Sequence, residues 1–351
     1  MILTIGIPVY NAEKFISRCL DSVMNLEDID KYEVICVDDG STDSTLDTLN
    51  KYAKAFRQLR VISTENEGAY RARERIIREA KGEWIGFIDA DDTVEKDMYI
   101  KMLVKASSAD HIDMVVSAFN KVDKVSEQIK AIQMNRFGNS DYDFVTNPLE
   151  RGILSAVNPA YWNKIFRKSK IENRLQLRTS PKIMEDLLFF LSIIPDLNGV
   201  GFIDAPLYNY YDIETSLTKK IGTKELKDAE EGLRALLEHL QTNSSISNGK
   251  YIWDLVLMMV YIHLGIAFTI NWNESNRITS IVRVYKETRY FIDKRLYYNK
   301  NCVFLSYNYV RQYPQIKKAF YACELYKSCL WPVVVKCYKF LSIVIKNDMK
   351  W

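Results

Sequence analysis

The sequence is poor in the residues that most often build metal and redox centres. Only three of its 351 residues are histidines, and its six cysteines form no CxxC pair and have no histidine partner at zinc-site spacing. Two of them lie in apolar periodic segments, so we expect small buried side chains and a reducing compartment. The cysteines are Cys19, Cys36, Cys302, Cys323, Cys329 and Cys337.

Glycine-rich phosphate loops are also absent. No GxGxxG follows the first apolar run, and no GxxxxGK[ST] occurs anywhere in the chain. This argues against a Rossmann dehydrogenase and a P-loop NTPase, and it favours neutralisation of phosphate by a metal ion. The net charge is only +3, so composition gives no case for nucleic-acid binding.

Long uninterrupted apolar runs are missing as well. The run 255–270 contains His263 and is shorter than the roughly 20 apolar residues of a spanning helix. The run 330–345 is interrupted by Lys336 and Lys339. We therefore expect a buried core helix in the first case, no spanning helix in the second, and a cytoplasmic protein.

The first hundred residues alternate between short apolar runs and segments with apolar residues at helical spacing. Because the connections are short, this pattern predicts an α/β fold, with a mostly parallel sheet flanked by helices on both faces. Ser41 or Thr42 stands where it could cap the second helix. The first strand pattern begins at once, so no signal peptide is expected. Strands are expected at 2–9, 33–37, 59–63 and 84–88, and further on at 113–119.

The fourth strand ends in an acidic cluster formed by Asp89, Asp91 and Asp92. Like charges this close repel one another unless a cation lies among them. Mg²⁺ typically takes one or two carboxylates together with substrate phosphates. Open α/β sheets bind ligands at the carboxyl ends of their strands, so the cluster is a candidate metal–phosphate site. The alternative is an Asp-rich turn that caps the next helix.

Other segments carry chemistry suited to such a site. A nucleotide pocket needs an aromatic wall, a carboxylate or amide for the base edge, and a cation for the diphosphate. Tyr10, Asp39 and Asp91 with its metal could supply these three. Glu185 and Asp186 open an apolar helix, where the helix dipole alone would favour acids. The functional alternative makes one of them a general base that faces the metal site.

Taken together, these motifs resemble the inverting family 2 glycosyltransferases of the bacterial cell-surface polysaccharide type, which have the GT-A (Rossmann-like) fold. The resemblance covers roughly residues 1 to 218. Each motif alone is weak, but their order and spacing are highly specific. The motifs are Pro8-Val9-Tyr10-Asn11, Val37-Asp38-Asp39-Gly40-Ser41-Thr42-Asp43, Asn66-Glu67-Gly68 with the Arg-bearing helix after it, the segment 82–92, Trp162-Asn163-Lys164 and Glu185-Asp186.

The resemblance implies a nucleotide-sugar donor, usually a UDP-sugar, used with Mg²⁺ or Mn²⁺. Asp91 would be the metal ligand of a DxD motif, and Asp89 would hold the ribose side of the donor. Asp186 would deprotonate the acceptor hydroxyl, with Glu185 orienting the acceptor or its loop. The acceptor would be a glycan or lipid-linked molecule; no nucleic-acid partner is expected, and the oligomeric state stays open. The donor-binding residues would be Pro8, Tyr10, Asn11, Asp39, Asn66, Arg71, Asp89, Ala90 and Asp91.

The chain departs from the family pattern in two places. Members often carry Arg or His just before the serine of a Tyr-rich segment, whereas 208–216 has no basic residue there. Lys219 or Lys220 would have to replace it. Tyr70 stands where small residues commonly follow the Asn66-Glu67-Gly68 triplet. Three functions stay open: an active transferase, a catalytically silent homologue acting as a binding or assembly subunit, and a nucleotidyltransferase or other nucleotide-binding enzyme.

The length of the chain allows two domains. We expect a catalytic domain at 1–220 and a mainly helical subdomain at 221–351, which begins with an amphipathic helix. The tail is either a helical region with a solvated basic face or a basic amphipathic surface lying on anionic lipid at the inner face of the membrane. Its lysines are Lys317, Lys318, Lys327, Lys336, Lys339 and Lys346, interleaved with Phe320, Tyr321, Leu325, Trp331, Tyr338, Phe340 and Ile343.

Overall fold

The computed structural model describes most of the chain, and the chain divides into two compact units. The first unit comprises Met1–Thr146, Pro159–Ile213 and Ala235–Leu240, and the second comprises Asn147–Asn158, Glu214–Arg234 and Gln241–Trp351. The expected domain boundary near residue 220 stays a prediction. The described residues are 1–27, 31–123, 129–133, 144–145, 150–172, 183–211, 221–242, 250–272, 278–296, 302–313 and 316–337.

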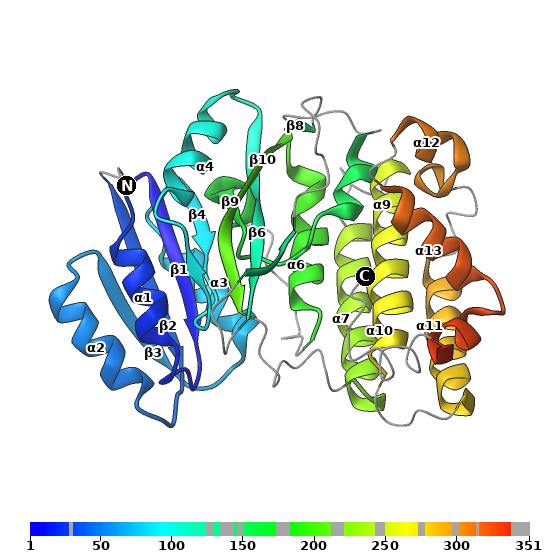
Figure 1. Cartoon of the computed structure of the whole chain (residues 1–351), viewed down its shortest axis with the longest axis horizontal. Coiled ribbons are helices and arrows are strands. Elements are labelled where there is room, and N and C mark those ends of the chain that lie inside the picture. Colours follow the sequence, from blue (N-terminus) through cyan, green and yellow to red (C-terminus); the bar gives the residue numbers. More distant parts are fainter. Residues whose placement is uncertain are drawn as a thin grey trace. The chain divides into compact units, whose positions relative to one another are not determined.

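A ten-stranded sheet forms the centre of the first unit (Figure 1). Its strands are β1 (Leu3–Val9), β2 (Tyr32–Asp39), β3 (Leu59–Thr64), β4 (Trp84–Phe87), β5 (Thr93–Val94), β6 (Ile112–Val122), β7 (Ile129–Gln133), β8 (Phe144–Val145), β9 (Lys164–Arg167) and β10 (Gly199–Tyr211). The order is β3-β2-β1-β4-β9-β6-β10-β5, with β7 paired to β6 and β8 to β10.

The pairing directions confirm an α/β fold with a largely parallel sheet. β3, β2, β1 and β4 run parallel, and β10 is parallel to β6. β9 lies between β4 and β6 and is antiparallel to both. β4 is buried at all four of its positions, as expected for a strand covered on both faces. The parallel strands therefore end at one edge, where the acidic cluster lies.

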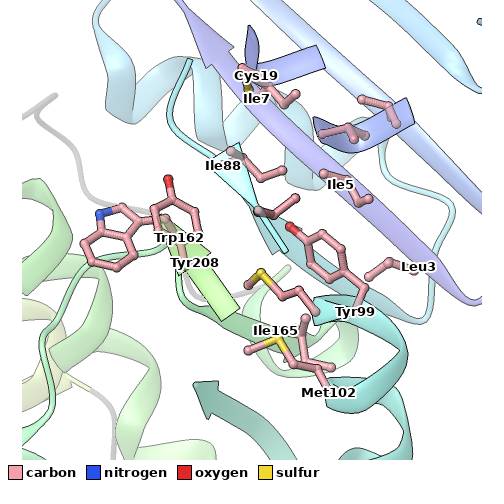
Figure 2. Close-up of a cluster of buried hydrophobic side chains, with 14 of the residues drawn as sticks. Leu3, Ile5, Ile7, Cys19, Ile88, Tyr99, Met102, Trp162, Ile165 and Tyr208 are labelled. Carbon is pink, nitrogen blue, oxygen red and sulfur yellow. The ribbon is translucent and has the colours of Figure 1, made fainter. Parts of the chain in front are cut away.

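Helices cover both faces of this sheet. They are α1 (Ile16–Met24), α2 (Thr45–Ala55), α3 (Ala69–Glu79), α4 (Met98–Ser107), α5 (Lys168–Ile171) and α6 (Glu185–Ile193), followed by the short 3-10 turn η2 (Ile194–Asp196). On one face, Ile5 and Ile7 of β1 pack with Cys19 of α1 and Tyr99 of α4 in one buried cluster (Figure 2). The apolar stripe predicted for α1 is confirmed, since its members are all buried.

The opposite face of the sheet packs on α3 and α6. A Cβ at Gly6 of β1 would lie 2.4 Å from Ile76 of α3, so glycine is what lets this helix approach the strand. Phe87 of β4 meets the Tyr161 ring edge-on at a centroid distance of 5.3 Å. Tyr161 in turn stacks on Phe189 of α6 at 4.2 Å. α3 and α6, which carry arginine and carboxylate side chains, are thereby held against the same part of the sheet.

The expected cap of the second helix is wrong. α2 begins at Thr45, and neither Ser41 nor Thr42 caps it. Both instead bind the loop after β1: the backbone N–H of Asn11 donates to Ser41 Oγ at 3.0 Å, and the Thr42 N–H donates to Asn11 Oδ1 at 2.8 Å. Asn11 has a positive φ of 47°, a conformation that asparagine tolerates better than most residues. The two residues thus connect neighbouring strand ends.

The remaining elements are helical. They are η1 (Glu150–Ala156), α7 (Thr223–Thr242), α9 (Lys250–Val260), the π-helical segment η4 (Tyr261–Ala267), α10 (Phe268–Ile270), α11 (Ile278–Arg295), η6 (Val303–Leu305), α12 (Tyr307–Gln312) and α13 (Lys317–Lys327). By length and composition, one described stretch, Tyr251–Ile270, could cross a membrane, and 72% of its most apolar window is buried inside the protein. That burial agrees with the core helix expected here.

Part of the predicted basic tail packs inside the protein. Trp331 is buried and donates its indole N–H to Thr269 Oγ1 at 2.8 Å, and Phe320 is buried as well. Lys317, Lys318 and Lys336 are exposed. The tail residues from 338 onward lie outside the described part of the chain. Two of the bulky residues proposed to face a membrane are thus unavailable for it, whereas three of the lysines face solvent.

Candidate active site

The acidic cluster lies directly after β4, and its three carboxylates have different surroundings. Asp92 is 1% exposed, and its carboxylate accepts hydrogen bonds from the Tyr208 hydroxyl at 2.7 Å and the Tyr211 N–H at 2.8 Å. Burial, followed by the charges of Asp91 and Asp89, raises the pKa of Asp92. Both oxygens of Asp92 therefore accept hydrogen bonds from β10, and its part in a metal–phosphate site stays a prediction.

Asp91, the residue predicted to hold a divalent cation, lies in the loop after β4. Its backbone carbonyl accepts a 2.7 Å hydrogen bond from Arg18, which fixes the loop from the side of α1. Among the described residues, no three His, Cys, Asp or Glu side chains are grouped to hold a metal ion. Mg²⁺ does not need such a cage when substrate phosphates complete its shell. A single carboxylate donor at the strand end fits that mode of binding.

Arg73 of α3 joins Asp89 to the two acids of α6. Its guanidinium is 2.9 Å from Asp89 Oδ1, 3.4 Å from Glu185 Oε1 and 3.9 Å from Asp186 Oδ1. It also lies over the Tyr161 ring, 4.4 Å from the centroid. Burial alone would lower the pKa of Arg73, but the three carboxylates outweigh burial and raise it. The buried side chain therefore stays charged and holds residues 112 positions apart in one ion-paired cluster.

Glu185 and Asp186 stand at the start of α6, as the sequence predicts. Burial raises the pKa of Asp186 to about 8; the Glu185 carboxylate adds to the rise, and Arg73 opposes it. Burial raises the pKa of Glu185 too. Met184, just before them, has a φ of 60°, which costs a non-glycine residue about 1–2 kcal/mol. Strain of this kind is often retained at functional sites, and here it turns the chain into the helix that carries both acids.

A second buried cation lies near these acids. Lys164 of β9 is fully buried and donates to the Ala160 carbonyl and to Asn163 Oδ1, both at 2.7 Å. Burial lowers the pKa of Lys164 to about 7, while the Asp186 carboxylate opposes that change. Asn163 also donates to the Ser117 carbonyl at 2.6 Å, which ties β9 to β6. The Trp162-Asn163-Lys164 motif thus buries an amine that interacts electrostatically with Asp186.

Several candidate nucleotide-binding residues lie in β1 or in the segments after β1 and β4. Tyr10 is 51% exposed, as a stacking wall for a base would have to be. Pro8 lies within β1, two residues before it. Ala90 is half-buried against the core cluster, and Asp89 keeps 29% of its side chain exposed. Their roles in binding a donor stay predictions.

Asp39 holds a loop rather than facing solvent. It is 3% exposed, and its carboxylate accepts from the Glu67 and Gly68 N–H groups, both at 2.8 Å. Gly40 has a φ of 70°, and a Cβ there would lie 2.9 Å from the Asn66 backbone nitrogen, so the close approach of the two loops needs glycine. A carboxylate retains further acceptor sites, so the assignment of Asp39 and the exposed Asn66 to the donor stays a prediction.

Sequence reasoning singled out Arg71 from this helix and missed Arg73. Arg71 pairs with Glu74 on its own helix, and Arg73 is the arginine that reaches the acids. A signal was available: Arg73 stands three residues after Tyr70 and three before Ile76, and both of these apolar residues are buried. Arginine on a buried stripe is rarely left unpaired. The donor-binding role of Arg71 stays a prediction.

The chain has relatives among known proteins. The model of glycosyl transferase family 2 matches residues 4–173. EpsH of Bacillus subtilis (strain 168) is 28% identical over 273 residues, which is 77% of both chains. The poly(ribitol-phosphate) beta-glucosyltransferase of Bacillus spizizenii is 35% identical over 215 residues, covering 60% of this chain and 32% of that protein.

The fold has solved relatives. The crystal structure of residues 1–349 of S. aureus TarS superposes with a TM-score of 0.65 at 17% identity, covering 100% of this chain and 93% of that one. Its likeness concerns the fold, whereas the family match concerns the segment that contains β1 to β4 and the acidic cluster. Over residues 4–173 this chain is similar to glycosyl transferase family 2, and it has the GT-A fold.

Proposed function

We propose that this protein is an inverting glycosyltransferase that moves a sugar from a UDP-sugar to a hydroxyl group of a glycan or lipid-linked acceptor in cell-surface polysaccharide synthesis. The Arg73 cluster carries the proposal, because it holds the end of the acidic strand and the acid pair of α6 together. Two relatives support the substrate classes. One is the poly(ribitol-phosphate) beta-glucosyltransferase, and the other is TarS, whose residues 1–349 have also been crystallised with UDP-GlcNAc.

The chemistry needs one base and one departing diphosphate. Asp186 accepts the proton of the acceptor hydroxyl, whose oxygen forms a bond to the anomeric carbon as the bond from that carbon to UDP breaks. A single displacement of this kind inverts the anomeric configuration. The raised pKa of Asp186 suits the role, because a carboxylate with an ordinary pKa is a weak base. Glu185 shares Arg73 with Asp89, and it orients the acceptor or its loop.

Charge that develops on the diphosphate must be balanced. Mg²⁺ or Mn²⁺, held by Asp91 and the phosphates, would supply that balance when bound. Asp89 is held by Arg73, and this leaves its exposed part to face the ribose. The exposed ring of Tyr10 forms the wall for the uracil, beside the loop that Asp39 holds.

Release of UDP from a panel of UDP-sugars, with a glycan or lipid-linked acceptor and Mn²⁺, tests the proposal. We expect one or a few donors to give UDP in step with glycosylated product. Binding of UDP-sugars without any turnover across donors and acceptors would instead favour the catalytically silent homologue. The absence of UDP binding with or without Mn²⁺ would refute both.

We further propose that the enzyme works at the cytoplasmic face of the membrane, held by its exposed lysines. Lys317 and Lys318 are exposed at the start of α13, and Val333 and Leu330 expose 53% and 59% of their surface. Each lysine near an anionic bilayer contributes about 1 kcal/mol, screened by salt. This placement would suit a lipid-linked acceptor.

Sedimentation with anionic liposomes tests the membrane proposal. A variant with Lys317→Glu and Lys318→Glu should stay in the supernatant at low salt, whereas wild type should pellet with the vesicles. Lys51 and Lys54, which are exposed on α2, give a matched control in which both are changed to Glu. If all three proteins pellet alike, or if none does, these lysines do not attach the protein to lipid.

A further inference from the structure

We propose that Tyr208 is a positioning residue for the acidic loop, defined as residues 89–92, and that it acts with Arg18 and Asp92 to set the direction of the Asp91 carboxylate. The inference rests on the proposed function, because it concerns how the Asp91 carboxylate would bind the cation on the donor diphosphate. It concerns residues that need not touch the donor. Its basis is a set of contacts that reach the loop from β10 and from α1.

The Tyr208 hydroxyl binds both ends of the acidic loop. It donates to Asp92 Oδ2 at 2.7 Å and accepts from the backbone N–H of Asp89 at 3.1 Å. The Asp92 N–H donates to the Asp89 carbonyl at 3.0 Å, which closes the turn. Asp91 lies between the two anchored residues. Its side-chain direction therefore depends on a turn that one phenol oxygen ties together.

A second contact comes from the end of β10. The N–H of Tyr211 donates to Asp92 Oδ1 at 2.8 Å, so both oxygens of that carboxylate are bound by one strand. Arg18 of α1 then lies over the Tyr211 ring, 3.6 Å from its centroid, and donates to the Asp91 carbonyl at 2.7 Å. The loop is held by α1 and β10 at three successive points: the N–H of Asp89, the carbonyl of Asp91 and the carboxylate of Asp92.

The Tyr208 ring is itself fixed in place. It is fully buried and stacks on Trp162 with a centroid distance of 4.5 Å and an interplanar angle of 19° (Figure 2). On the strand, Tyr208 pairs with Val94 of β5, which follows the acidic loop. A phenol held this firmly cannot follow the loop if the loop moves. It defines one position for the loop instead.

The buried cluster that contains Tyr208 also contains a tyrosine whose hydroxyl does not bind the acidic loop. Tyr99 of α4 is also fully buried, and its hydroxyl has no hydrogen-bond partner among the described residues. Both rings are drawn in Figure 2. Tyr208→Phe and Tyr99→Phe therefore remove the same atom from the same core. Only the first change leaves the Asp92 carboxylate and the Asp89 N–H short of a partner.

Calorimetry with UDP in the presence and absence of Mn²⁺ tests the inference on the full chain. Tyr208→Phe should weaken Mn²⁺-dependent UDP binding on the order of tenfold, since a buried group is left unpaired beside the cation ligand. Tyr99→Phe should stay within about twofold of wild type, by the same reasoning. If both variants bind alike, Tyr208 has no positioning role. If wild type shows no Mn²⁺-dependent UDP binding, it is the proposed function that fails.

Arg18 gives a second test that does not depend on a core substitution. Arg18→Met removes the hydrogen bond to the Asp91 carbonyl and the contact with Tyr211, and it should weaken Mn²⁺-dependent UDP binding several-fold. Lys14→Met, at an exposed position just before α1, is the matched control and should leave it unchanged. Should Tyr208→Phe fail to fold, an Arg18→Met protein with wild-type binding would overturn the inference by itself.

Discussion

Arg73 and Asp89 form a 2.9 Å ion pair in which the arginine comes from the middle of α3 and the aspartate from the end of β4. Only 6% of the Arg73 side chain is exposed. Because a buried guanidinium cannot lose its charge, it must keep carboxylate partners wherever the fold puts it. The same guanidinium also contacts Glu185 and Asp186, so this ion pair holds the acids of α6 beside the acidic loop.

Arg73→Met should lower activity and move the pH dependence of turnover. Arg73 opposes the rise in the pKa of Asp186, so its loss should raise that pKa further and shift the rising limb of the pH–rate profile to higher pH. Arg75→Met, an exposed arginine of the same helix, is the control and should leave the profile in place. A profile that stays unchanged in the Arg73 variant would contradict the coupling.

Asp91→Ala should abolish the stimulation of UDP binding by Mn²⁺. Without this carboxylate the diphosphate would face Asp89 with no cation held between them, and the two negative charges would repel. Calorimetry with UDP, with and without Mn²⁺, measures the effect. Metal-stimulated affinity that persists in the variant would remove Asp91 from the metal site.

Asp186→Asn should keep UDP-sugar affinity and lower turnover, because an amide of the same shape cannot accept the proton of the acceptor. A general base typically contributes about 10²–10⁴-fold in rate. Steady-state kinetics of this variant beside Glu185→Gln assigns the pair. Near wild-type turnover in Asp186→Asn together with an inactive Glu185→Gln would reverse the assignment.

Stability should also depend on pH through Asp186. Its pKa is about 8 in the folded chain and about 3.9 in an unfolded one, so the folded chain holds this proton more tightly. The resulting stabilisation is fully present only below about pH 3.9. That contribution is lost as the pH rises through the folded pKa. The free energy of unfolding of wild type minus that of Asp186→Asn should therefore fall between about pH 4 and pH 8. A flat difference in denaturant titrations would mean that the pKa is not raised.

The sequence predicted those parts of the site that lie on local patterns. Asp91 and the Glu185–Asp186 pair were placed correctly after a strand and at the start of a helix, because chain order alone fixes those positions; their roles stay predictions. The different fates of the three acids could not be found in this way. The contact of Asp92 with Tyr208 joins residues 116 positions apart, and no periodicity relates β10 to the acidic loop.

The fold shows the same limit. Parallel strands β1 to β4 were predicted because each alternates with a helix. The antiparallel entry of β9 between β4 and β6 was not, because its four residues carry no signal of direction. Arg73 was missed for a related reason. Helix α3 carries four arginines. Only the burial of Arg73 on the apolar side of the helix distinguishes it from the other three.

The late position of β9 in the chain has a consequence for synthesis on the ribosome. Until residues 164–167 emerge, β4 is the open edge of a nascent four-stranded sheet, with the apolar sequence Trp84-Ile85-Gly86-Phe87 unpaired on one side. Apolar edges of this kind recruit other chains. A fragment that stops before residue 160 should therefore self-associate on a sizing column, whereas one that extends through Tyr211, the end of β10, should not.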